Sequence, residues 1–178
     1  MKKTLFILGF TLLSVVASKT FAQTANVNIT LSDVISFTVS QPAGLSVNFD
    51  SESKYNTGIT ALATDHITVV SSRGYIIKAK AGTVTGTAAL SAGTIKLTSA
   101  IGATNGGNTT GITYQSDVVL PTSSAASATI VTAANSSWNG SVSSNKFNIS
   151  YLIGANGAYA GKATGANVIP VVYTVTQP

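Results

Sequence analysis

The chain has 178 residues, of which 44% are hydrophobic and 8% are charged, and it contains no cysteine. This apolar content argues against intrinsic disorder, and without disulfides a core and backbone hydrogen bonds must hold the chain together. The net charge is +5, but the basic residues form no stripe with interleaved aromatic residues, so nucleic-acid binding is not expected.

The N-terminal stretch has the pattern of a bacterial signal peptide. Lys2 and Lys3 form a positive n-region, residues 5–16 are mostly apolar, and Thr20 and Ala22 are small residues before a cleavage site. The apolar run is short for a bilayer span, which favours cleavage over the alternative of a retained anchor. No later stretch is long and apolar enough to cross a membrane.

We therefore expect two parts, a signal peptide over residues 1–22 and a single β-domain over residues 23–178. The domain would be exported to the cell surface or the extracellular space, with the periplasm as the alternative location. Its length suffices for one core.

Directly after the predicted signal peptide, apolar and polar residues alternate over residues 25–31. Val27, Ile29 and Leu31 share one face of this stretch. Such an amphipathic strand must lie on a sheet, which is either its own or that of another molecule. This choice separates a monomeric secreted domain from a subunit of a polymer.

Short runs of the same kind recur along the chain, separated by clusters of Gly, Asn, Ser and Pro. Strands are expected at 25–31, 34–39, 45–49, 66–71, 74–81, 94–99, 112–120, 127–132, 146–153 and 168–176. No window keeps a helical period over three turns, and residues 125–134 would form one short helix at most. The pattern predicts an all-β sandwich or barrel.

Two predicted strands have clear faces. Residues 66–71 and 75–81 flank Ser72-Arg73-Gly74, which predicts a tight hairpin, and in the second strand Tyr75, Ile77, Ala79 and Ala81 share one face. In the last strand one face is formed by Ile169, Val171, Tyr173 and Val175. Pro170 cannot donate a ladder hydrogen bond, so it favours an edge position or a bulge there.

Residues for catalysis or metal binding are scarce. His66 is the single histidine, and it is either half of an acid–base pair with Asp65 or a residue at a hairpin edge with a charged neighbour. No Gly-x-Ser-x-Gly motif is present, and Asp50 and Glu52 alone are too few oxygen ligands for calcium. We predict no catalytic residue, no metal site and no cofactor.

Trp138 lies in a turn-like stretch and has two interpretations. It could stack on a sugar ring, or it could cap one end of the sandwich core. The first interpretation would make the protein a carbohydrate binder.

The C-terminal pattern resembles that of a known group of proteins. It consists of Phe147-x-Ile149-x-Tyr151, then Gly157-x-Tyr159-x-Gly161, then Val171-Val172-Tyr173-Thr174-Val175. It is similar to the end of bacterial pilin-type domains, namely chaperone–usher fimbrial subunits and the related spore-coat-U-like secreted proteins. The alternating N-terminal strand resembles theirs as well.

The resemblance implies an immunoglobulin-like β-sandwich of short antiparallel strands, which strand exchange between neighbours would complete. Val27, Ile29 and Leu31 would be the donated plugs. The last strand, with Ile169, Val171, Tyr173 and Val175, would line the groove or offer an edge to a periplasmic chaperone.

Together these observations favour a structural subunit of a fimbria-like surface fibre that associates with itself or with other fibre subunits. The alternative is a secreted carbohydrate-binding or adhesin module that uses Trp138 and exposed loop residues.

Overall fold

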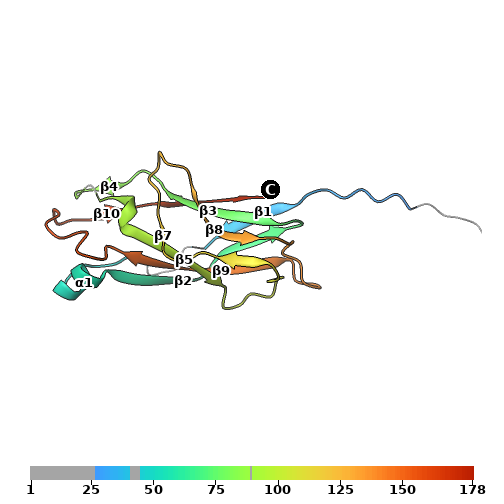
Figure 1. Cartoon of the computed structure of the whole chain (residues 1–178), viewed down its shortest axis with the longest axis horizontal. Helices are drawn as coiled ribbons and strands as arrows, with labels where there is room; N and C mark the ends of the chain where they lie inside the picture. Colours follow the sequence, from blue (N-terminus) through green and yellow to red (C-terminus); the bar gives the residue numbers. More distant parts are fainter. Residues whose placement is uncertain (1–26, 41–44, 89) are drawn as a thin grey trace, which may run out of the picture. The chain divides into compact units, whose positions relative to one another are not determined.

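The computed structural model describes residues 27–40, 45–88 and 90–178. The chain divides into two units, Met1–Leu31 and Ser32–Pro178. The larger unit is an all-β sandwich built from antiparallel sheets, which confirms the expected fold class (Figure 1). The predicted signal peptide lies outside the described residues.

The described residues of the larger unit form three sheets. The first has the order β1-β2-β9-β5-β7, the second has the order β11-β3-β8-β6, and β10 and β4 form a small third sheet. The first contains β1 (Ile35–Val39), β2 (Ile59–Ser71), β9 (Ser144–Ile153), β5 (Ile95–Ile101) and β7 (Val118–Val119). The second contains β11 (Val171–Thr176), β3 (Tyr75–Ala81), β8 (Ala128–Ala133) and β6 (Ile112–Tyr114). The remaining elements are β10 (Asn167–Val168), β4 (Thr85–Gly86), the helix α1 (Glu52–Thr57) and a 3₁₀ turn, Ala92–Thr94.

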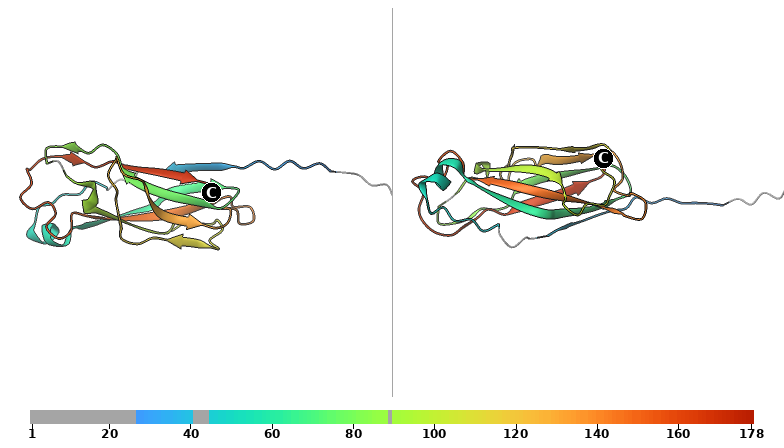
Figure 2. Two further views of the ribbon diagram at one scale, coloured as in Figure 1. Left: turned by 45° about the horizontal axis from the view of Figure 1, so that its top comes forward. Right: turned by 90° about the horizontal axis from the view of Figure 1, so that it is seen from below.

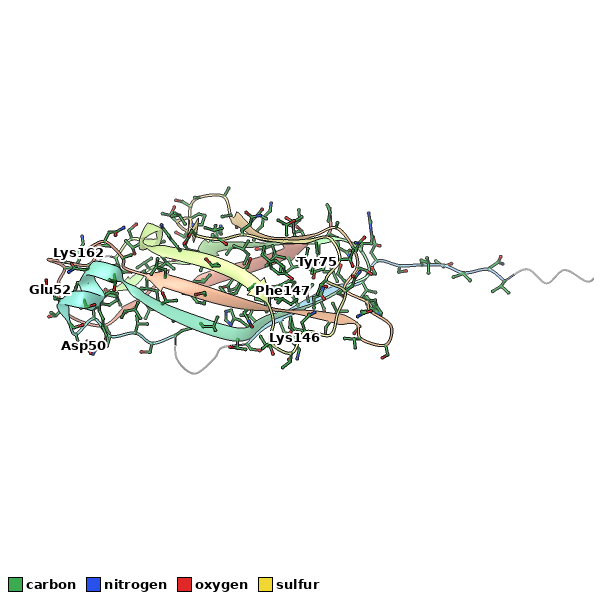
Figure 3. The ribbon with its side chains drawn as sticks, turned by 60° about the horizontal axis from the view of Figure 1, so that its bottom comes forward. Asp50, Glu52, Tyr75, Lys146, Phe147 and Lys162 are labelled. Atoms are coloured by element: carbon green, nitrogen blue, oxygen red, sulfur yellow. The ribbon has the colours of Figure 1, made fainter. Side chains whose placement is uncertain are left out.

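The core lies between the two larger sheets and follows the period-two pattern of the sequence. In β3 the expected inward face is buried, with Tyr75, Ile77 and Ala79 fully inaccessible and Ala81 nearly so. Phe147 of β9 meets this face from the other sheet, and its ring lies 6.3 Å from the Tyr75 ring at an interplanar angle of 73°. Figure 3 shows both rings between the two layers.

Replacing Phe147 with alanine should destabilise the fold strongly. The side chain is fully buried, so truncation leaves a cavity between the sheets, and we expect the free energy of unfolding to fall by about 3–5 kcal/mol. Chemical denaturation measures this loss. Leu62→Ala is the matched control, since Leu62 is 62% exposed on β2 and its truncation should change stability by less than about 0.5 kcal/mol. Equal losses in the two variants would contradict the described core.

The predicted hairpin at Ser72-Arg73-Gly74 is wrong. β2 already pairs with β1 and β9, and β3 already pairs with β11 and β8, so neither strand has a free side for the other. Residues 72–74 instead carry the chain from one sheet to the other. A side chain at Gly74 would have its Cβ 2.8 Å from the carbonyl oxygen of Ala134, which is why a glycine is needed at this crossing.

The single strand expected at 112–120 is divided into β6 and β7, which belong to different sheets. The crossing lies at residues 115–117, where Gln115 bonds through its backbone to Ile130 on one side and Ser99 on the other. Asp117 has a φ of 52°, which turns the chain between them.

Other boundaries differ from expectation as well. β2 begins at Ile59, well before the expected start at residue 66, whereas β8 (Ala128–Ala133) confirms the strand expected at 127–132. The helix α1 was not expected, because its six residues are too few to establish a period. One charge pair accompanies it, in which Lys54 Nζ lies 2.7 Å from Asp50 Oδ1.

Two expected strands are absent. Residues 45–49 have no strand assignment, and the described part of the expected strand 25–31, residues 27–31, has none either. Residues 25 and 26 lie outside the described residues. Within the described part of the chain, none of the helices has the length and apolarity to span a lipid bilayer.

Candidate assembly site

One lateral edge of the sandwich is formed by the outermost strands of the two larger sheets. β1 pairs only with β2, and β11 pairs only with β3, so each strand presents one unpaired side among the described residues. Figure 2 shows β1 (blue) and β11 (red) next to each other. The position of β11 agrees with the edge expected from Pro170, which lies just before it.

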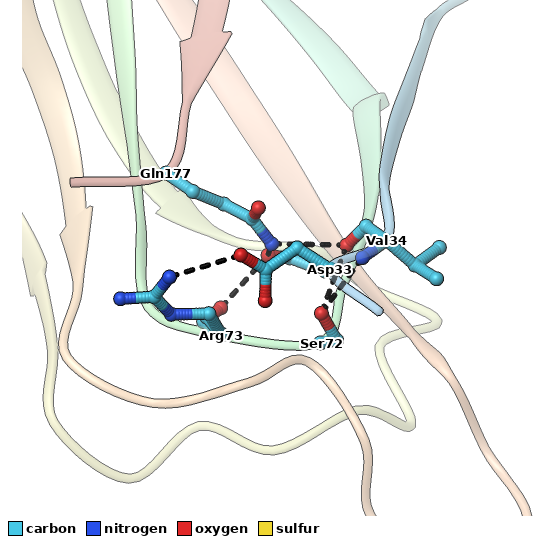
Figure 4. A network of polar contacts seen from close by, with 6 residues as sticks. Asp33, Val34, Ser72, Arg73 and Gln177 are labelled. Atoms are coloured by element: carbon cyan, nitrogen blue, oxygen red, sulfur yellow. Dashed lines mark hydrogen bonds and ion pairs between the residues drawn. The ribbon is translucent and has the colours of Figure 1, made fainter. Parts of the chain in front are cut away.

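The end of β11 is held beside the start of β1. Gln177 donates from Nε2 to the carbonyl oxygen of Val34 at 3.0 Å and to Ser71 Oγ at 2.9 Å (Figure 4). Ser72 also contacts Val34, because its Oγ accepts from the Val34 backbone N–H at 2.8 Å. β1 and β11 therefore run in opposite directions along this edge, and the beginning of β11 lies toward the other end of the domain.

The inward side of β1 is incompletely covered. Phe37 faces the same side as its cross-strand partner Val69, yet Phe37 is 41% exposed while Val69 is fully buried. Ile35, two residues earlier on the same face, is 40% exposed. The opposing sheet ends at β11, so no strand of the described part of the chain covers these two side chains.

The edge continues beyond β1 in residues 45–49. Leu45, Val47 and Phe49 are half-buried, and the residues between them are exposed. No backbone hydrogen bond joins this segment to another described residue. An extended segment with free N–H and C=O groups is competent to pair with an added strand.

A cavity of about 370 Å³ lies between this segment and the chain that leads into β11. Its volume is within the range of protein binding sites. Its lining includes the apolar side chains of Leu45, Val47, Phe49, Ile95, Ile153 and Ile169. Polar residues, among them Asn48, Lys162 and Asn167, line it as well.

Three aromatic rings organise this end of the domain. The Phe49 ring lies 5.4 Å from that of Tyr55 in α1 and 5.1 Å from that of Tyr159. Tyr159 is anchored by a 2.8 Å hydrogen bond between its hydroxyl and Thr94 Oγ1, and burial raises its pKa. Gly154 has a φ of +67°, and a Cβ there would lie 2.5 Å from the Tyr159 ring, so only glycine fits. Asp50, Glu52 and Lys162 surround this end, as Figure 3 shows.

A chain of buried hydrogen bonds connects β1 and β11, the two strands of the lateral edge. His66 Nδ1 bonds to the carbonyl oxygen of Ser40, which directly follows β1, so this nitrogen carries the proton. Nε2 then accepts from the Tyr151 hydroxyl at 2.8 Å, and Tyr151 in turn bonds to the hydroxyl of Tyr173 in β11. One imidazole thus ties the exit of β1 to β11.

Burial sets the protonation of these groups. Desolvation lowers the pKa of His66, although its bond to Ser40 opposes the shift. Burial raises the pKa of Tyr151 to about 12 and also raises the pKa of Tyr173. All three side chains are therefore neutral at physiological pH.

The structure separates His66 from Asp65, so the two do not form an acid–base pair. Asp65 accepts from the hydroxyl and the backbone N–H of Thr104, chiefly the former, and these bonds lower its pKa. His66 lies on the buried side and is 3% exposed, so the expectation of a hairpin-edge residue is wrong. The register shift between Ala63 and Ile67, with a φ of 48° at Asp65, explains how adjacent residues diverge.

The sequence located part of this site. In the last strand Ile169, Val171, Tyr173 and Val175 share the inward face, as expected, and pack against the core. The proposed plugs Val27, Ile29 and Leu31 are 79%, 76% and 90% exposed. Trp138 is 40% exposed, and the structure does not join it to the cavity.

The part of the cavity lined by residues 45–49 does not follow from the sequence. The alternation of these residues predicts an ordinary paired strand and does not distinguish it from an unpaired segment that lines a cavity. In the sequence Tyr159 is notable only as part of the C-terminal Gly-x-Tyr-x-Gly pattern. Nothing in the sequence indicates that its ring contacts Phe49.

No protein-family model matches the chain, and no curated protein sequence matches it. Among the described residues, no group of three His, Asp or Glu side chains is placed to hold a metal ion. The assignment of function therefore depends on the lateral edge and its cavity.

Proposed function

We propose that the protein is an exported structural subunit of a bacterial surface fibre. Residues 27–31 of one copy insert as a strand at the lateral edge of the next copy, between β11 and residues 45–49. The observation that carries this proposal is the cavity between residues 45–49, which have no backbone hydrogen bond to another described residue, and the chain that leads into the edge strand β11.

The chemistry of the two surfaces is complementary. The donor segment alternates apolar and polar residues, and its apolar side chains are exposed in the single chain. Burying a Val, Ile or Leu side chain is favourable by about 1.5–3 kcal/mol. The main chain of β11 would supply hydrogen bonds, while the cavity and the uncovered side of β1 would receive the side chains.

The resemblance of both ends of the sequence to pilin-type proteins supports this proposal. Export, a fimbrial location and the help of a periplasmic chaperone belong to the same proposal. Each subunit would carry one donor segment and one acceptor edge, so the contact is head-to-tail and forms an open filament.

Deleting residues 23–31 should abolish self-assembly while leaving a folded sandwich, because the remaining chain begins with the larger unit at Ser32. We expect the variant to be monomeric by analytical ultracentrifugation under conditions where the chain from Gln23 forms filaments. Circular dichroism would report whether the β-structure is retained.

A synthetic peptide of residues 23–32 provides the complementary test. It should bind the deletion variant with 1:1 stoichiometry in calorimetry, and a peptide carrying Ile29→Asp is the matched control. Filaments formed by the deletion variant, or equal binding of the two peptides, would refute strand insertion.

A further inference from the structure

We propose that the turn carrying Trp138 forms a second contact within the fibre, packing against the α1 end of the next copy. This inference rests on the proposed function. It adds a contact between folded domains to the inserted strand.

Trp138 lies close to the point where the chain enters β1. Its neighbour Ser137 donates its backbone N–H to the carbonyl oxygen of Ser71 at 2.9 Å, and Ser137 Oγ accepts from the Ser71 N–H at 2.8 Å. Ser71 pairs with Ile35, the first residue of β1. The turn is therefore attached to the end of the domain from which the donor segment departs.

The turn presents an apolar surface to solvent. Asn139 and Val142 close it with reciprocal backbone hydrogen bonds of 2.8 and 3.0 Å. Trp138 is 40% exposed and Val142 is 39% exposed. A further hydrogen bond attaches the turn to a neighbouring loop, because Asn139 Nδ2 donates to the carbonyl oxygen of Gly106 at 3.4 Å.

The direction of the inserted strand decides what this surface meets. All pairings among the named strands are antiparallel, and antiparallel addition to β11 would place Leu31 near the beginning of that strand. That position is the cavity end, where Ile169 lines the wall and α1 supplies Tyr55.

The connection to the donor domain is short. Leu31 and Ile35 are four positions apart in the sequence, so even a fully extended chain spans only about 14 Å between them. The end of the donor domain that surrounds the start of β1 must then lie against the α1 end of the acceptor. Trp138 and Val142 are the exposed large apolar residues of the turn at that end.

The α1 end suits a tryptophan as a partner. It combines the aromatic rings of Phe49 and Tyr55 with the nearby carboxylates of Asp50 and Glu52. An indole buries a large apolar surface and offers one N–H donor, which a carboxylate can accept. Tryptophan is also among the residues that most often dominate binding at interfaces.

The single tryptophan of the chain makes this contact directly measurable by fluorescence. Filament formation by the chain from Gln23 should shift the Trp138 emission to shorter wavelength, because water is excluded from the ring. Binding of the 23–32 peptide to the deletion variant fills the groove without a neighbouring domain, so it should leave the emission unchanged.

Affinity gives an independent readout. A subunit that carries the donor segment should bind the deletion variant about tenfold more tightly than the peptide does, and Trp138→Ala in the donor should remove that gain. Leu62→Ala in the donor is the matched control on an exposed residue of β2. Trp138→Phe should retain part of the gain, which separates lost contact from misfolding.

The outcomes distinguish this inference from the proposed function. If the peptide does not bind, strand insertion fails and the inference fails with it. If the peptide binds and filaments form but Trp138 emission does not shift, strand insertion stands and the second contact is wrong. A tenfold gain that survives Trp138→Ala would also overturn the second contact.

Discussion

A subunit carrying Ile29→Asp should not polymerise, although it should fold as well as the unchanged protein. Ile29 is 76% exposed in the single chain, so the substitution removes nothing from the core. In the proposed fibre the same side chain packs against apolar side chains of the acceptor edge such as Leu45 and Ile169, where a carboxylate is costly to desolvate. We expect at least a hundredfold loss of affinity for the acceptor edge, which corresponds to about 2.7 kcal/mol.

The control for this variant is Asn28→Asp. It adds the same negative charge one position away, on the polar face of the segment, and should reduce assembly little. Light scattering and electron microscopy of the two variants, at the same concentration and salt, provide the comparison. Equal loss of assembly would show that charge rather than the face of the strand matters, and undiminished assembly of Ile29→Asp would refute insertion of the apolar face.

The faces of single strands could be predicted from the sequence because they depend on local alternation. Tyr75 and Ile77 are buried, and Tyr173 faces inward, as the period of two requires. The edge position of the last strand also followed from a local property, the missing N–H of Pro170. These predictions needed no knowledge of which strand pairs with which.

The pairing of strands could not be predicted in the same way. The residues around Gly74 have the composition of a hairpin turn, but the two sides of β2 are occupied by strands that are distant in sequence. Residues 45–49 have the alternation of a strand and still lack a pairing partner among the described residues. Whether an alternating segment is paired depends on the whole sheet, and the proposed acceptor site includes this unpaired segment.

His66 shows the same limit for a single side chain. A histidine beside an aspartate indicates either acid–base chemistry or a charged surface, and both interpretations assume that the two side chains share an environment. The bulge at Asp65 separates them and turns the imidazole toward Tyr151. The resulting chain of bonds connects β11 to the residue that follows β1, so His66 helps to hold the two edge strands together.

Acidification should therefore weaken the fold through His66. Burial holds the pKa of this group below its ordinary value of 6.5, so between the two values the unfolded chain binds a proton that the folded chain does not. The stability contributed by the neutral imidazole is fully present above about pH 6.5 and is lost as the pH falls from that value through the lower pKa of the folded state. The slope for one proton is at most about 1.4 kcal/mol per pH unit.

The hydrogen-bond chain gives the physical reason for the loss. Neutral His66 donates to Ser40 and accepts from Tyr151, so a second ring proton removes the acceptor on which the Tyr151 hydroxyl depends. Tyr151 and Tyr173 cannot compensate by ionising, because burial raises the pKa values of both. The pKa values of Asp50 and Asp65 are lowered from 3.8, so the stability that they contribute is lost only at more acidic pH.

The measurement is direct because the chain contains one histidine. The imidazole proton resonance of the folded deletion variant should titrate with a midpoint below 6.5, and denaturation between pH 7.5 and about 5 should show decreasing stability. His66→Gln should remove this dependence, whereas Tyr173→Phe should lose about 1 kcal/mol at every pH and keep it. A folded-state midpoint at or above 6.5 would mean that protonation does not oppose folding. The buried hydrogen-bond chain between β1 and β11 would then not be the acid-sensitive element of the lateral edge.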